Sequence, residues 1–195
     1  QGPELNVPNG VDLADIIFGD GGVLLDRTGN EVLGFVLFFV FFGFATCITK
    51  QHKHAKEDGF PVVLYLDARE HKYVDEFGTS NFIAITKDGK YVTPDSPSAL
   101  PSITNKSLMA LAEEMGLEVE RRPILFDEIE DFAEVAACGT AVVITPVNRI
   151  VRGERVLQVG PQDGVGPTLQ KLYDRMLGIQ FGELPDHYGW TVPVD

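Results

Sequence analysis

The pattern of apolar and polar positions predicts strands along most of the chain beyond residue 60. Residues 62–67 form a continuous apolar run of the kind found in a strand buried in a sheet. The dipeptide Asp88-Gly89 is a hairpin turn signal, and Gly153 holds the turn position between two later runs. The other segments expected to form strands are 72–76, 81–86, 91–93, 117–123, 134–138 and 142–147, with a hairpin over 148–160.

Two segments have the periodicity of amphipathic helices. Apolar residues recur at i, i+3, i+4 and i+7 before Gly116, which supplies a C-terminal stop. Pro167 starts the second helix, which is expected to end near Gly178 or Gly182, and a short helix is expected near Asp127. The apolar positions are Leu108, Leu111, Ala112 and Met115 in the first helix and Leu169, Leu172, Tyr173, Met176 and Leu177 in the second. Strands and helices in this irregular order indicate a mixed α/β or α+β fold.

One apolar segment, residues 32–48, differs from the rest of the chain. It contains 17 consecutive uncharged residues, which is at the short limit of the roughly 17 to 25 that a membrane helix needs. Two glycines, Thr46 and Cys47 interrupt it, and the chain has no second candidate span. We therefore expect a buried segment rather than a membrane anchor.

The charge and the cysteines limit the possible partners. A net charge of -13 argues against nucleic acid and anionic membrane surfaces, because both are polyanions. Small molecules are the expected partners. Cys47 and Cys138 are too few and too far apart for a disulfide framework or a four-ligand zinc site, so no metal is expected and a reducing compartment is favoured. Cys138 is expected to be a small buried residue rather than a redox-active thiol.

A first candidate site lies where a loop passes through Ser102 and Ile103 into a helix. The free N–H groups of a first helical turn, together with the Thr104 hydroxyl, would form a seat for a phosphate group. The alternative is that Thr104 or Asn105 merely caps the helix, and this stretch alone favours the cap.

A second candidate is the tripeptide Gly139-Thr140-Ala141, between two runs expected to be strands. Gly139 would let the backbone approach a ligand closely, and Thr140 would add a hydroxyl and an N–H for an anionic oxygen. A tight strand connection explains the same residues equally well.

A third candidate is the pair Asp75 and Glu76 at the end of a predicted strand. Alternation along the strand sends one carboxylate to solvent and the other toward the interior. A buried carboxylate needs a cationic partner or a proton, and a protonated pyridine ring would be such a partner. Taken alone, the pair fits a solvent-facing corner better.

The order of these three stretches resembles the C-terminal part of the branched-chain aminotransferases of fold type IV. These enzymes depend on pyridoxal 5'-phosphate (PLP), and fold type IV also includes D-amino acid aminotransferase. The resemblance runs from Ala55 to Val194, which is 140 of the 195 residues. The motifs that carry it are "YLDAREHKYVDEFGTSNF", "TPDSPSALPSITNKSLMALAEEMG", "EVAACGTAVVITPV", "GVGPTLQKLYDRMLGIQFG" and "DHYGWTVPV".

The resemblance implies a set of cofactor-binding residues. Glu76 matches the glutamate that pairs with the pyridine nitrogen of PLP, so that the ring can act as an electron sink. Leu100 matches the leucine that packs on the ring. Ile103 and Thr104 match the residues that hold the phosphate group, and Thr140 matches the threonine that completes this cup.

The resemblance also implies a reaction and its substrates. The family transfers an amino group reversibly from leucine, isoleucine or valine to 2-oxoglutarate, and its members are expected to be homodimers. Thr140 and Ala141 match the pair whose backbone N–H groups receive the substrate carboxylate, and Thr79 lies where a threonine lines the site. Amino acids and 2-oxo acids are thus the expected partners.

The lysine that forms the family's internal Schiff base is not where the resemblance places it. The family motif K-x-G-G-N-Y-A should fall at about 39–45, where this chain has "FVFFGFA". Lys50, Lys53 and Lys56 lie nearby, but such a shift would place the amine far from the reacting carbon. We therefore assign no catalytic residue. Residues 1–50 also do not match the family's smaller N-terminal domain, which we expect to be largely missing.

Three functional hypotheses follow. The first is a branched-chain amino acid transaminase by descent, with residues 51–195 as its PLP-binding domain and with impaired activity because the lysine motif is absent. The second is a non-catalytic PLP-binding or dimerisation remnant that pairs with intact subunits. The third is a D-amino acid aminotransferase or an aminodeoxychorismate lyase. The expected location is the cytoplasm or the mitochondrion.

Overall fold

The structure is a computed structural model of the chain, and its described residues are 55, 57, 59–161 and 164–192. Contacts divide the chain into residues 1–50 and residues 51–195, and every described residue lies in the second unit. The apolar segment, the expected lysine position and Lys50, Lys53 and Lys56 lie outside the described residues, so the expectations about them stay predictions. Among the residues that are described, no helix is long and apolar enough to cross a membrane.

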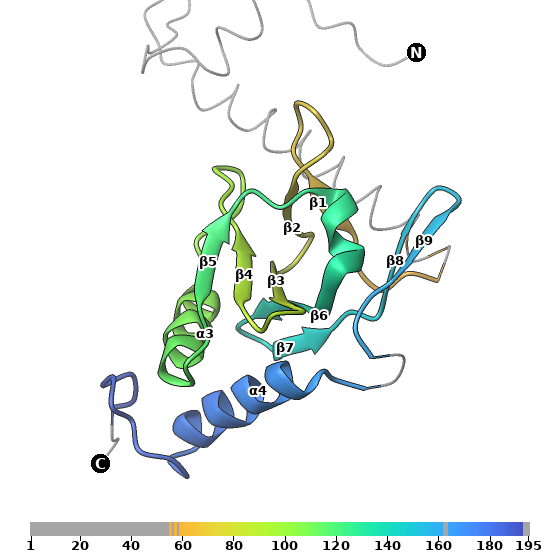
Figure 1. Cartoon of the computed structure of the whole chain (residues 1–195). Helices are drawn as coiled ribbons and strands as arrows, with labels where there is room; N and C mark the ends of the chain where they lie inside the picture. Colours follow the sequence, from red (N-terminus) through yellow and green to blue (C-terminus); the bar gives the residue numbers. More distant parts are fainter. Residues whose placement is uncertain (1–54, 56, 58, 162–163, 193–195) are drawn as a thin grey trace, which may run out of the picture. The chain divides into compact units, whose positions relative to one another are not determined.

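Five strands form the main sheet of the described unit, in the order β5-β4-β3-β6-β7 (Figure 1). β3 is antiparallel to both its neighbours, and the β3–β4 connection is the hairpin that Asp88-Gly89 predicts, with Gly89 at a φ of 87°. β5 runs parallel to β4, which requires a crossover connection, and helix α3 provides it. The strands are β3 (Asn81–Thr86), β4 (Tyr91–Pro94), β5 (Val119–Arg122), β6 (Phe132–Gly139) and β7 (Val143–Pro146).

Strand β3 is the centre of the sheet and is buried on both faces. Phe82 and Ala84 belong to one hydrophobic cluster, while Ile83 and Ile85 belong to the other, and all four side chains are inaccessible to solvent or nearly so. Because successive strand residues point to opposite faces, this short apolar run contributes to both cores.

Two helices cover one face of the sheet, as their periodicity predicts. α3 (Ile103–Glu114) buries Leu108, Leu111 and Ala112, and α4 (Pro167–Gln180) buries an apolar face against the same cluster as Ile83 and Ile85. In Figure 1 the two helices lie on the same side of the sheet. The buried residues of α4 are Leu169, Leu172, Met176, Gly178 and Ile179.

The opposite face is covered by shorter elements. Two antiparallel pairs, β1–β2 and β8–β9, and a 3-10 helix, η1, surround the cluster that contains Phe82. The expectation for 62–67 is wrong in length, because the strand spans three residues and all three are only half-buried at the edge of a two-stranded sheet. The bounds are β1 (Leu64–Leu66), β2 (Val74–Phe77), η1 (Phe126–Asp131), β8 (Arg149–Arg152) and β9 (Arg155–Gln158).

Candidate functional site

The two carboxylates of β2 point in different directions and have different environments. Asp75 is 8% exposed, and its Oδ1 accepts a hydrogen bond of 2.6 Å from the Ser96 hydroxyl. Glu76 is half-buried, and its Oε2 accepts a hydrogen bond of 3.2 Å from the backbone N–H of Leu100. Burial raises the pKa of Glu76 above its ordinary value and the nearby Asp75 adds to this, while the Leu100 N–H opposes it.

Asn81 holds Glu76 and Leu100 together. Its Nδ2 lies 3.4 Å from Oε2 of Glu76 and donates a 2.9 Å hydrogen bond to the carbonyl oxygen of Leu100. Two backbone hydrogen bonds between Phe77 and Ser80 close a tight turn, which brings Glu76 and Asn81 opposite each other. Asn81 has no role among the expectations drawn from the sequence. Asn81 lies in the same sequence motif as Glu76, and this position is the signal that could have identified it as a site residue.

The first turn of α3 begins directly after the Leu100 segment. Ser102 is the N-cap, with its Oγ accepting a 3.1 Å hydrogen bond from the N–H of Asn105. The expectation that Thr104 or Asn105 caps this helix is therefore wrong. Within the described part of the chain, no hydrogen bond uses the N–H of Ile103 or Thr104. The side chains of Leu100 and Ile103 are each 74% exposed, which leaves two large apolar groups at the surface beside free donors.

The Gly139-Thr140-Ala141 turn joins β6 to β7 and lies beside the turn that contains Thr79. Asn81 on β3 pairs with Cys138 on β6, so the residues just before Asn81 lie beside the residues just after Cys138. A Cβ built on Gly139 would lie 3.6 Å from Cβ of Ser80 and 4.0 Å from the Thr79 carbonyl oxygen. Thr79, Thr140 and Ala141 are all exposed. This turn is a tight strand connection as well as a candidate ligand site.

The backbone beyond this turn is strained. Val143 has a φ of 59°, and the N–H of Ile144 donates a 2.7 Å hydrogen bond to the carbonyl oxygen of Val142. A hydrogen bond between residues two apart around a positive φ is a rare γ-turn, and a β-branched residue is especially costly there. Strain of this kind concentrates at functional sites.

The sheet topology explains why these residues lie together. β2 and β6 end, and β3 and β7 begin, at the same end of the strands because the neighbours are antiparallel. The candidate site residues named from the sequence therefore lie at this one end of the sheet. The gathered residues are Glu76, Thr79, Leu100, Ile103, Thr104, Thr140 and Ala141.

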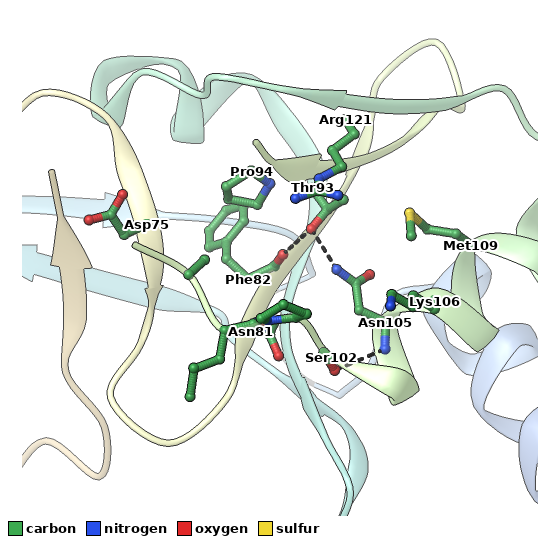
Figure 2. Close-up of a pocket in the computed structure, with 13 residues that line it drawn as sticks. Asp75, Asn81, Phe82, Thr93, Pro94, Ser102, Asn105, Lys106, Met109 and Arg121 are labelled. Carbon is green, nitrogen blue, oxygen red and sulfur yellow. Dashed lines mark hydrogen bonds between the residues drawn. The ribbon is translucent and has the colours of Figure 1, made fainter. Parts of the chain in front are cut away.

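A cavity of about 220 Å³ lies behind this end, on the Asp75 side of β2 (Figure 2). Its polar lining is largely occupied by internal hydrogen bonds, such as the 2.9 Å bond from Nδ2 of Asn105 to Oγ1 of Thr93. Neither Glu76 nor Thr104 lines it. Of the gathered candidate residues, only Leu100 lines the cavity, so the cavity adjoins the exposed group and does not contain it.

Cys138 is a buried structural residue. It is 1% exposed, and burial raises the pKa of its thiol to about 12, which disfavours the reactive thiolate. No group of three or more His, Cys, Asp or Glu that could hold a metal ion occurs among the residues that the structure describes.

Comparison with known proteins gives consistent matches over the described unit. The family described as amino-transferase class IV matches residues 48–150. The branched-chain-amino-acid aminotransferase of Haemophilus influenzae is 41% identical over 150 residues, which cover 74% of this chain and 44% of that protein. The chain thus spans less than half the length of this relative.

Solved structures match the same region. The branched-chain amino acid aminotransferase from Escherichia coli superposes with a TM-score of 0.62 and 32% identity, covering 71% of this chain and 44% of that one. The branched-chain amino acid aminotransferase from Thermobaculum terrenum, in its PLP form, gives a TM-score of 0.58 at 29% identity, covering 68% of this chain and 41% of that one.

Proposed function

Because this chain belongs to the class IV aminotransferase family, we propose that residues 51–195 form the PLP-binding part of a transaminase for branched-chain amino acids. The observation that carries the proposal is the grouping of Glu76, Leu100 and the first turn of α3 around Asn81. When bound, PLP supplies an electron sink for the carbanion formed at the amino acid Cα.

The residues present fit the ring of this cofactor. The carboxylate of Glu76 accepts hydrogen bonds but has no cationic partner among the described residues, and burial raises its pKa. A protonated pyridine nitrogen would provide the missing positive charge and would favour the ionised carboxylate. Leu100 would cover the ring with an apolar side chain that is otherwise 74% exposed.

The residues present also fit the phosphate group. The N–H groups of Ile103 and Thr104 are free at the start of a twelve-residue helix, where the helix dipole favours an anion. Thr140 would complete the phosphate cup from the β6–β7 turn, and the backbone N–H groups of Thr140 and Ala141 would receive the substrate carboxylate. Thr79 would line the same space. These roles rest on the resemblance and on the grouping of the turns.

We propose that turnover is impaired in this chain, because the family motif K-x-G-G-N-Y-A has no counterpart at 39–45. Without a lysine amine there, the chain lacks the group that would move a proton at the substrate Cα. The alternative that this absence favours is a PLP-binding subunit that pairs with an intact partner and contributes no turnover of its own.

Borohydride reduction in the presence of PLP, followed by peptide mapping, tests the proposal. Specific labelling of Lys50, Lys53 or Lys56 would show that the reactive amine has moved, and would contradict impairment if leucine and 2-oxoglutarate also turn over. PLP binding with no labelled lysine and no turnover supports the cofactor-binding subunit. A full chain that binds neither PLP nor pyridoxamine 5'-phosphate would overturn the proposed cofactor site itself.

A further inference from the structure

The side chain of Asn105 connects the first turn of α3 to the central sheet. Its Nδ2 donates a 2.9 Å hydrogen bond to Oγ1 of Thr93, and its Oδ1 accepts a 2.7 Å hydrogen bond from the hydroxyl of Tyr91. Figure 2 shows the Asn105 side chain reaching from the helix toward Thr93 on β4. One amide group thus joins the helix to two positions on the same strand.

The directions of these hydrogen bonds are fixed by the partners. The Thr93 hydroxyl donates its proton to the carbonyl oxygen of Phe82 at 2.9 Å, so its oxygen must accept from Asn105. The amide nitrogen of Asn105 therefore faces Thr93, and its oxygen faces Tyr91, which must donate. Tyr91 is completely buried, and burial raises its pKa well above the ordinary value, so the phenol remains a neutral donor.

The network is buried where it meets the sheet. Tyr91 is 0% exposed and Thr93 is 2% exposed, so both hydroxyls depend on protein hydrogen-bond partners in the folded chain. An unpaired buried donor or acceptor carries the full cost of its desolvation. The side-chain conformation of Asn105 is therefore more tightly constrained than that of a surface residue.

The same residue also closes the helix start. The backbone N–H of Asn105 donates to the Oγ of Ser102, and Ile103 and Thr104 are the only residues between these two. The side chain of Asn105 anchors this turn to β4, and its backbone anchors it to the cap. The free N–H groups of Ile103 and Thr104 are consequently held in one orientation relative to the sheet.

We infer that Asn105 is a positioning residue for phosphate recognition, holding the Ile103 and Thr104 N–H groups through its bonds to Tyr91 and Thr93. This inference rests on the proposed function, in which those N–H groups receive the cofactor phosphate. It assigns Asn105 no contact with the ligand. Its effect is to fix the donors in advance, so that phosphate binding does not have to order the turn.

The test compares a phosphorylated ligand with its unphosphorylated analogue. We would measure the Kd of pyridoxamine 5'-phosphate and of pyridoxamine on the full chain by equilibrium dialysis. Both are amines, so neither requires a reactive lysine. The variants are Asn105→Ala, Thr93→Val and Tyr91→Phe, each checked for folding by circular dichroism. Three independent positions keep the test decisive if one variant does not fold.

The control removes the same chemical group from the other end of the helix. The Tyr188 hydroxyl donates to Oε2 of Glu114 at 2.9 Å and lies 3.3 Å from the carbonyl oxygen of Ala110. Tyr188→Phe therefore loses a hydroxyl bonded to α3 without affecting its first turn.

We expect the network variants to weaken pyridoxamine 5'-phosphate binding about tenfold, since hydrogen bonds to a charged group are strongly geometry-dependent. Pyridoxamine affinity should stay unchanged in the same variants, and Tyr188→Phe should change neither ligand. The amide NMR signals of Ile103 and Thr104 should shift with inorganic phosphate in the wild type and respond less in Asn105→Ala.

Two results would overturn the inference and are distinguishable. If the wild type binds both ligands equally, the phosphate seat of the proposed function fails, and the role of Asn105 fails with it. If the wild type prefers the phosphorylated ligand and the folded variants keep the same preference, the proposed function stands and Asn105 is merely structural.

Discussion

Asn81 lies opposite Glu76, with Nδ2 of the amide 3.4 Å from Oε2 of the carboxylate. The two residues face each other across the turn closed by Phe77 and Ser80. Because the same nitrogen donates to the Leu100 carbonyl, one side chain sets the positions of a carboxylate on β2 and of the loop before α3. Two segments distant in sequence are joined in this way into one site.

Replacing Glu76 by glutamine should weaken cofactor binding without lowering the stability of the free protein. The pKa of Glu76 in the folded protein is raised, mainly by burial. Without the cofactor, folding therefore favours the protonated carboxyl over the ionised carboxylate. Its contribution to stability is full below the unfolded pKa and is lost as pH rises through the folded pKa. Glu76→Gln should therefore leave the free protein at least as stable at neutral pH and weaken PLP binding about tenfold or more.

Urea unfolding between about pH 4 and 7 and cofactor titration would measure both effects of this substitution. Glu113→Gln, at an exposed position on α3, is the control. A loss of stability at neutral pH in Glu76→Gln would contradict the assigned direction of the pKa.

The substitution Asn81→Asp should raise the pKa of Glu76 further. It replaces a hydrogen-bond donor by a second negative charge about 3.4 Å from Oε2. A carboxyl carbon titration by NMR would measure this pKa directly, and adding salt should reduce the shift because the site is partly exposed. An unchanged pKa would mean that Asn81 does not contact Glu76 in solution.

Removing Glu134 should destabilise the fold without involving the candidate site. The Glu134 carboxylate is 4% exposed and accepts hydrogen bonds from the N–H groups of Thr168 (2.9 Å) and Leu169 (2.8 Å) at the start of α4. It caps this helix because Gly166 has no side chain to do so, and a Cβ at Gly166 would lie 2.1 Å from Cδ of Glu134.

We expect Glu134→Ala to lower the free energy of unfolding by about 2 to 4 kcal/mol, from the lost cap and the unpaired buried donors. Glu154→Ala, at an exposed turn position, should have little effect on the same urea curve. Equal stability of the two variants would exclude the capping role.

At position 143, the glycine variant should be at least as stable as the alanine variant, which is the reverse of the usual order in a strand. In an ordinary strand glycine is less stable than alanine by about 0.5 to 1 kcal/mol, but a positive φ costs an L-residue about 1 to 2 kcal/mol. At the φ of 59° of Val143, Val143→Gly should be as stable as Val143→Ala or more stable. Val135, buried in β6, is the control, where Val135→Gly should be the less stable of the pair. Urea unfolding curves of the four variants would measure this, and the usual order at both positions would argue against the γ-turn.

Local sequence patterns predict most of the helices and strands, and the sequence motifs name the candidate residues. The spacing of Leu108, Leu111 and Ala112 placed α3, and Asp88-Gly89 placed the β3–β4 hairpin, because local periodicity and turn chemistry act over a few residues. The motifs likewise point to Glu76 and Thr140. The helix and the hairpin are encoded locally, so a single segment predicts them, whereas the roles expected for Glu76 and Thr140 rest on the order of several motifs along the chain.

How the residues of the site are supported becomes clear from the folded chain, in which distant segments meet. The amide of Asn105 could cap a helix or bond to a strand, and the sheet settled this by burying the Tyr91 and Thr93 hydroxyls beside it. The 62–67 run was expected to be a buried strand, yet β1 spans only Leu64–Leu66 and lies in a two-stranded sheet apart from the five-stranded one, where its side chains are half-buried. Which polar groups pair, and which strand becomes central, depends on contacts between distant segments, and local sequence patterns do not contain this information.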